Sequence, residues 1–185
     1  AKTLLENVKS NPKYESDAHY YLGHIAYQLE DYAAASSSFN RVSKKDQQEN
    51  LGYFQVEMNF KLGRFEKAIQ LGEKEIQTTN RENFSELSKI LGESYFNTGQ
   101  YGKALKHLKN YEGKKGKWTH TDFYQLGYAY YETKDYSQAI EQFSKIIGKK
   151  DKLAQNAYYY LAECYLNKQR KISKQNIFRG LLSHF

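Results

Sequence analysis

The residue types that usually carry out catalysis or bind metals are few and widely separated in this 185-residue chain. Its histidines lie at positions 19, 24, 107, 120 and 184, and no two have the spacing, with a nearby glutamate, of a helical zinc protease site. The single cysteine, Cys164, excludes an internal disulfide and a cysteine-based zinc site. Glycine-rich phosphate loops, dinucleotide fingerprints and serine nucleophile elbows are absent. The sequence therefore predicts no enzyme activity and neither a metal site nor a cofactor.

Aromatic side chains are the other residues that could bind a ligand. The chain has 18 tyrosines and 10 phenylalanines. Tyrosine combines a large apolar ring with a polar tip, so it suits both helix packing and an accessible binding surface. Which role each tyrosine has depends on the elements that carry it.

A short pattern that recurs along nearly the whole chain indicates those elements. Its clearest copy runs from Leu126 to Phe143 and has the form Leu-Gly-x2-Tyr…Ala-x3-Phe. The alanines of four copies, at positions 35, 68, 104 and 139, are 33, 36 and 35 residues apart. Small residues at such positions let two helices approach closely. The pattern resembles the tetratricopeptide repeat, a helix–turn–helix unit of about 34 residues.

This resemblance implies an all-α, right-handed solenoid in which each repeat packs against its neighbours. We number each repeat so that its Leu-Gly pair occupies places seven and eight. Five repeats then begin near residues 16, 49, 85, 120 and 155, and the copy at 49 is the most divergent. Residues 1–15 fit the second helix of an incomplete repeat, which Pro12 ends. Because the linkers are short, we expect residues 1–185 to form a single array of eleven helices without strands.

The register of the repeats sorts the tyrosines into two groups. At 100° per residue, places four, seven, eight and eleven of a first helix share the arc that packs on other helices. The tyrosines predicted to be core residues are Tyr95, Tyr130 and Tyr165 at place eleven, and Tyr32, Tyr101 and Tyr136 at the turn.

Places five, nine and twelve lie on the other arc, which the resemblance assigns to the concave face. We call their side chains the predicted groove. They are Tyr20, Tyr53, Lys89, Tyr124 and Tyr159 at place five, His24, Glu57, Glu93, Tyr128 and Glu163 at place nine, and Tyr27, Phe60, Phe96 and Tyr131 at place twelve. Accessible aromatic residues are common binding anchors, but residues at place twelve are equally suited to pack against the next repeat.

The resemblance implies a non-catalytic scaffold that binds an extended or helical peptide of a partner protein in this groove. Some relatives clamp chaperone C-termini with lysine at place five and asparagine at place nine. Here only Lys89 meets the first requirement, and place nine never carries asparagine, so that clamp is absent. The acids at place nine favour a peptide with lysine or arginine. No small-molecule substrate is expected.

Two alternative functions stay open. The net charge is +7, and residues 144–185 hold nine lysines and arginines but two acids. This basic end, residues 168–174 above all, could touch nucleic acid or an anionic surface, although a solvated turn explains it more simply. The other alternative is a structural module in which a second copy, or another part of the same chain, fills the groove by self-association.

The sequence says less about the compartment. No apolar run approaches the roughly 20 residues that a helix needs to span a bilayer, so a transmembrane segment is not predicted. Residues 151–166 are similar to the last repeats of large bacterial multi-repeat proteins of the cell envelope. That resemblance favours the envelope or periplasm over the cytoplasm.

Overall fold

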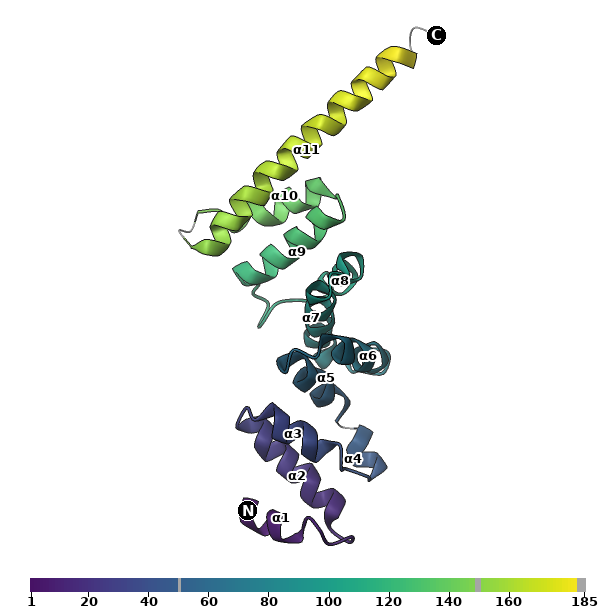
Figure 1. Cartoon of the computed structure of the whole chain (residues 1–185), viewed down its shortest axis with the longest axis vertical. Coiled ribbons are helices and arrows are strands. Elements are labelled where there is room, and N and C mark those ends of the chain that lie inside the picture. Colours follow the sequence, from purple (N-terminus) through teal and green to yellow (C-terminus); the bar gives the residue numbers. More distant parts are fainter. Residues whose placement is uncertain (50, 149–150, 183–185) are drawn as a thin grey trace. The chain divides into compact units, whose positions relative to one another are not determined.

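The computed structural model is built from helices (Figure 1). It describes residues 1–49, 51–148 and 151–182, and for residues 81–82 and 174–182 the backbone alone. Within these ranges there is no strand, and one isolated bridge joins Lys114 to Lys117. The helices are α1 (Lys2–Val8), α2 (Glu15–Gln28), α3 (Tyr32–Phe39), α4 (Lys45–Glu49), α5 (Gly52–Lys61), α6 (Phe65–Glu75), α7 (Arg81–Asn97), α8 (Tyr101–Leu108), α9 (His120–Glu132), α10 (Tyr136–Ser144) and α11 (Lys152–Leu182).

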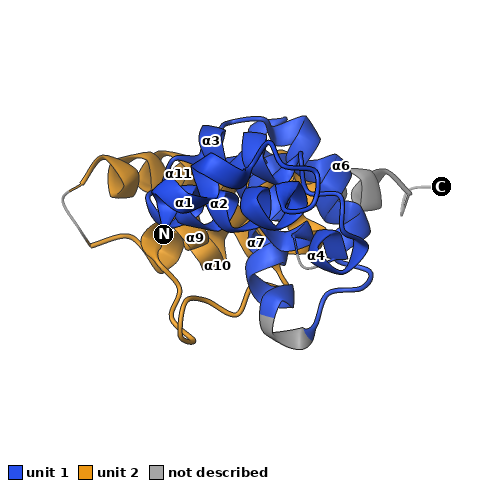
Figure 2. Cartoon of the chain, turned by 90° about the horizontal axis from the view of Figure 1, so that it is seen from below, with its two compact units in different colours: residues 1–98 blue, residues 99–185 orange. Residues whose placement is uncertain are grey.

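The chain forms two compact units, residues 1–98 and 99–185 (Figure 2). In the first unit α1 packs on α2, α2 on α3, and α5 on both α6 and α7. In the second unit α9 packs on α8 and α10, and α11 packs on α9 and α10. The helix pairs α2–α3, α5–α6 and α9–α10 are therefore complete repeats, each within one unit.

The turns between paired helices repeat the same backbone geometry. Place fifteen adopts a positive φ in four repeats, at Glu30 (59°), Gly63 (70°), Gly99 (72°) and Lys134 (63°). In the first, second and fourth repeats the next residue donates its N–H to the carbonyl of place eleven, as Asp31 does to Ala26 at 2.9 Å. This is the hydrogen bond that closes a helix at its C-terminus. Two of the residues at place sixteen, Asp31 and Asp135, also cap the second helix. Their carboxylates accept N–H groups of its first turn.

An aromatic pair holds the turn in each of the three helix pairs that lie within one unit. Place twelve contacts place seventeen, with ring centroids about 6 Å apart. The pairs are Tyr27–Tyr32 at 5.9 Å, Phe60–Phe65 at 5.9 Å and Tyr131–Tyr136 at 6.1 Å.

Close approach within a helix pair explains the small residues of the pattern. A Cβ atom added at Gly23 would lie 2.3 Å from the ring of Phe39, and one at Gly127 would lie 2.9 Å from the ring of Phe143. The alanines at positions 35, 68, 104 and 139 are fully buried, as the sequence predicted. At the N-terminal end of the first unit, α1 packs on α2.

The fifth repeat does not form the expected helix pair. Residues 152–182 form one continuous helix of 31 residues, α11. The described part of the chain still holds eleven helices, because α4 is an additional short helix between the first and second repeats. Tyr165, predicted to be core, is 56% exposed, since no second helix covers it.

The reason lies in the residues that should form the last turn. Place seventeen, aromatic in the other four repeats, is Lys171, so the aromatic pair across the turn is missing. Lys174 also replaces the buried alanine. With no signal to stop, good helix formers continue the helix.

Candidate functional site

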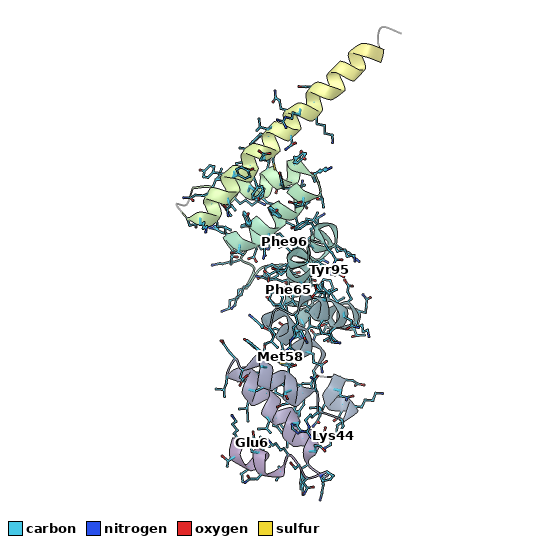
Figure 3. All side chains as sticks on the ribbon, viewed as in Figure 1. Glu6, Lys44, Met58, Phe65, Tyr95 and Phe96 are labelled. Carbon is cyan, nitrogen blue, oxygen red and sulfur yellow. The ribbon has the colours of Figure 1, made fainter. Side chains whose placement is uncertain are left out.

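The predicted groove is only partly accessible. Thirteen of its fourteen side chains are half-buried, and Tyr159 is the exposed one, at 61%. Among the half-buried residues is Phe96, next to the buried core residue Tyr95 on α7 (Figure 3). The described side chains therefore show neither a fully buried row of tyrosines nor a fully open one.

In the second unit, most of the groove tyrosines pack around a residue that sequence reasoning missed. Tyr160, on α11, has its ring centroid 4.9 Å from that of Tyr128, 5.0 Å from Tyr131 and 6.4 Å from Tyr124. It also stacks on Phe143 at 6.0 Å. The three groove tyrosines of α9 therefore help to hold α11 on the α9–α10 pair.

The first unit repeats this arrangement around Phe54 of α5. Its ring lies 5.1 Å from His24, 5.0 Å from Tyr27 and 6.2 Å from Phe39. Phe54 and Tyr160 both stand at place six of their repeats. An aromatic residue at place six, which Tyr21 shares, was the sequence signal that could have revealed this contact.

The acids of the predicted groove are already hydrogen-bonded or ion-paired inside the first unit. The Tyr27 hydroxyl donates to the Glu57 carboxylate at 2.5 Å, and Lys89 lies 4.0 Å from Glu93. Burial, followed by that hydrogen bond, raises the pKa of Tyr27 well above its usual range, and burial does the same for the pKa of Tyr53. At neutral pH both phenols are therefore hydrogen-bond donors.

A polar hollow of about 390 Å³ lies beside Tyr53 in the first unit. Its lining residues come from the end of α4, from the end of α6 and the residues that follow it, and from the starts of α5 and α7. They are Glu49, Tyr53, Phe54, Glu75, Thr78, Thr79, Asn80 and Asn83. Two carboxylates, several neutral hydrogen-bonding groups and two aromatic rings can accept a cationic side chain.

Glu75 is unusual for its position in the repeat. It stands at place 27, where the other repeats bury the apolar side chains of Val42, Tyr111 and Ile146. The missing side chain of Gly52 makes room for it, since a Cβ atom there would lie 1.9 Å from a Glu75 carboxylate oxygen. Burial raises the pKa of the Glu75 carboxyl.

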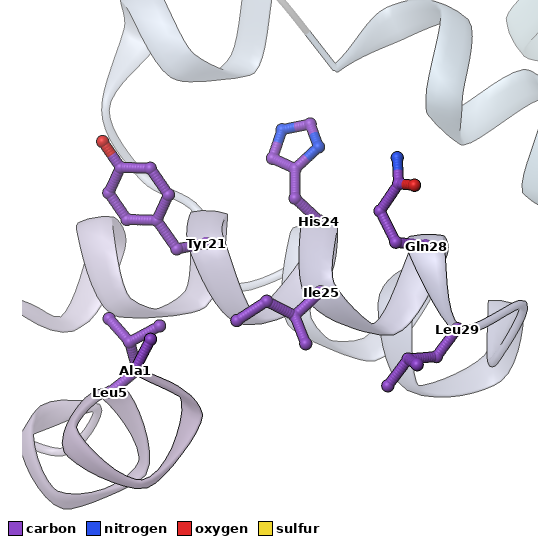
Figure 4. Close-up of a pocket in the computed structure, with 7 residues that line it drawn as sticks. All are labelled: Ala1, Leu5, Tyr21, His24, Ile25, Gln28 and Leu29. Carbon is purple, nitrogen blue, oxygen red and sulfur yellow. The ribbon is translucent and has the colours of Figure 1, made fainter.

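A second hollow, of about 490 Å³, lies between α1 and α2 and is almost entirely apolar (Figure 4). Its lining residues are Ala1, Leu5, Tyr21, His24, Ile25, Gln28 and Leu29. Tyr21, at place six, is 55% exposed here, whereas Phe54 and Tyr160 contact a preceding first helix. This hollow is thus the end face of the first complete repeat.

The remaining candidate residues show no reactive chemistry. Cys164 is fully buried, and burial raises the pKa of its thiol to about 11, which fits an inert core residue. Burial lowers the pKa of His19 and His24. Among the described residues, no cluster of three histidine, cysteine or acidic side chains could hold a metal ion. In the same ranges, no helix combines the length and the apolar character needed to cross a membrane.

The comparisons with known proteins agree with the fold. A search of the curated proteins finds no match. The sequence model of the tetratricopeptide repeat matches residues 20–83 and 124–171, which together are more than half of the chain. These ranges contain the helix pair α5–α6, most of α9, all of α10 and the first part of α11. The chain belongs to the tetratricopeptide repeat family, whose members generally mediate protein–protein interactions and are typically non-catalytic.

Proposed function

We propose that this chain is a non-catalytic scaffold that binds a segment of a partner protein along the predicted groove. The segment carries lysine or arginine, and one of its cationic side chains enters the polar hollow beside Tyr53. The observation that carries this proposal is the half-buried Glu75 at the edge of that hollow, in a place where the other repeats bury apolar side chains.

Burying a carboxylate costs free energy unless an opposite charge accompanies it. A cation in the hollow would favour ionised Glu75 and recover that cost. The faces of Tyr53 and Phe54 add a cation–π attraction, and Glu49 supplies a second negative charge. A residue that lowers the stability of the free protein and favours a complex is typical of a binding site.

In the second unit the same chemistry is available on α11. Tyr159 and Glu163 are four residues apart, so they share one helix face. Tyr159 is exposed and Glu163 is half-buried. This ring and carboxylate, rather than the packed Tyr124 and Tyr128, are the proposed contacts of the second unit.

The test is a selection of random peptides displayed on phage against the immobilised protein. We expect enrichment of lysine and arginine. The tightest peptide, measured by fluorescence anisotropy, should bind the Glu75→Gln variant at least about tenfold more weakly, because a partly buried ion pair is lost. Glu66→Gln is the matched control, since Glu66 is exposed near the other end of α6.

Two results would contradict the proposal. One is enrichment of acidic or uncharged peptides, and the other is an equal affinity for both glutamine variants. A concentration-dependent dimer that displaces the selected peptide would instead favour self-association through the groove.

A further inference from the structure

Among the residues that the structure describes, none covers one face of the long helix α11. Its residues Ala154, Ala157, Leu161 and Cys164 are buried, and α11 packs on α9 and α10. About a quarter turn around the helix lies a second row at spacings of four, three and seven residues. We call this row the open face; it consists of Tyr158 (51% exposed), Ala162, Tyr165 (56%) and Ile172 (49%).

In other repeats the second helix of the pair covers the equivalent face. Place four is His19 in α2, which is 6% exposed, and place eleven is Tyr130 in α9, which is 7% exposed. Place eight is Gly23 or Gly127, against which Phe39 and Phe143 pack. The open face therefore has the residue types and spacing of a helix-binding surface, with Ala162 as the small residue at its centre.

Up to Leu182, the last residue described, the chain does not fold back over this face, because α11 is continuous from Lys152. In Figure 1 its last turns, in yellow, extend away from the α9–α10 pair of the same unit. Exposed apolar side chains on one helix face that is equivalent to buried faces elsewhere in the chain favour a partner helix.

Charge identifies the kind of helix that fits. Residues 164–185 include five lysines and arginines and no acid. Lys168 and Lys171, with Lys134 from the α9–α10 turn, line a hollow of about 280 Å³ that also includes Ile172 and one acid, Asp135. A second copy of α11 would bring like charges together, which opposes a symmetric helix pair.

We propose that the open face docks an acidic amphipathic helix of a partner protein. A large apolar side chain of that helix packs on Ala162 between Tyr158 and Tyr165, as Phe143 packs on Gly127. Its carboxylates lie over the hollow lined by Lys134, Lys168 and Lys171. This surface is separate from the predicted groove, so the two proposals can fail independently.

The experiment uses a fluorescein-labelled, hydrocarbon-stapled helical peptide of about 15 residues, with phenylalanine and leucine on one face and glutamate on the other. Its affinity for the 185-residue chain is measured by anisotropy at several salt concentrations. We expect binding that weakens as salt rises. The same peptide with lysine in place of glutamate should not bind.

Two variants of the protein locate the contact. Ala162→Glu places a negative charge and extra bulk on the open face, and should weaken binding at least about tenfold. Asn156→Glu adds the same charge to an exposed position on the other side of α11, and should leave the affinity nearly unchanged. Circular dichroism confirms that both variants stay folded.

Three results would overturn the proposal. The first is an absence of peptide binding at any soluble concentration, and the second is an equal effect of both variants. The third is occupation of the face by something else. A dimer in ultracentrifugation that Ala162→Glu dissociates would identify a second copy, and tighter binding of a single-stranded RNA oligonucleotide than of the peptide would identify nucleic acid.

Discussion

The fourth and fifth repeats have similar first helices but opposite surroundings. Leucine at place seven is buried in both, as Leu126 and Leu161. Tyrosine at place eleven is 7% exposed in the fourth repeat, as Tyr130, and 56% exposed in the fifth, as Tyr165. The difference arises from the next segment of the chain, which is a turn and α10 in the fourth repeat and the continuation of α11 in the fifth.

The comparison shows that the role of an aromatic side chain is not decided by its own helix. The apolar arc of α9 and that of α11 have the same periodicity, but only α9 has a second helix of its own to pack against. A tyrosine on such an arc is a core residue or an accessible one according to whether the turn after it forms.

The largest expected effect is the difference in stability lost when tyrosines of α9 and tyrosines of α11 are removed. Changing Tyr124 and Tyr128 together to alanine should lower the free energy of unfolding by about 3 kcal/mol or more, because both rings pack around Tyr160. The matched change of Tyr158 and Tyr165 should cost less than about 1 kcal/mol. Urea denaturation followed by circular dichroism measures both. Equal costs would mean that Tyr158 and Tyr165 are packed as tightly in solution as Tyr124 and Tyr128.

The next prediction concerns place eight of the same helices. Gly127→Leu should destabilise the protein by about 1–3 kcal/mol, since the added side chain would overlap the ring of Phe143. Ala162→Leu should be nearly neutral, because Ala162 is exposed. Thermal melts of the two variants compare them directly. A large loss from Ala162→Leu would show that the open face is covered in solution.

The turn residues of the fourth repeat can be introduced into the fifth repeat. The combined changes Gln169→Gly, Arg170→Asp, Lys171→Tyr and Lys174→Ala give α11 the missing signals. We expect the helix to break there and the two parts to pair. Spin labels at Asn156 and Ser173, about 25 Å apart along a continuous helix, should move closer in a dipolar electron resonance measurement. An unchanged distance would mean that residues beyond the turn also oppose pairing.

The smallest expected effect concerns Glu75, which stands where the other repeats have apolar residues. Its carboxyl should make the stability of the fold depend on pH. Burial raises the pKa of Glu75 above its ordinary 4.5 in the folded state. Below that value the carboxyl is protonated in both states. Between pH 4.5 and the raised pKa, the unfolded chain has lost this proton while the folded protein still holds it. The free energy of unfolding therefore decreases as pH rises through this range.

Glu75→Gln should therefore raise the melting temperature at pH 7 by a few degrees and change it little near pH 4. Glu66→Gln again serves as the exposed control. A melting temperature that falls at pH 7 would show that ionised Glu75 stabilises the free protein, against the role proposed for the hollow.

Much of the fold could be predicted from spacing alone. The recurring Leu-Gly, alanine and phenylalanine positions specify which faces of two helices must meet, and the alanines at positions 35, 68, 104 and 139 are fully buried as expected. These features depend on helix periodicity and on the size of single side chains, both of which are local properties of the sequence.

The partners of the groove tyrosines depended on tertiary structure. Helix periodicity places Tyr128 and Tyr131 on one arc of α9, but it does not show that Tyr160, about 30 residues later, lies between them and Phe143. The same holds for Glu75, which is half-buried against Gly52 of another helix, where the missing side chain leaves room for its carboxyl. By itself the sequence determined the helix pairs α2–α3, α5–α6 and α9–α10 and their register, because those depend on local periodicity and turn residues. Only the tertiary structure decided which side chains stay accessible for binding, because burial depends on contacts between helices that are distant in the chain.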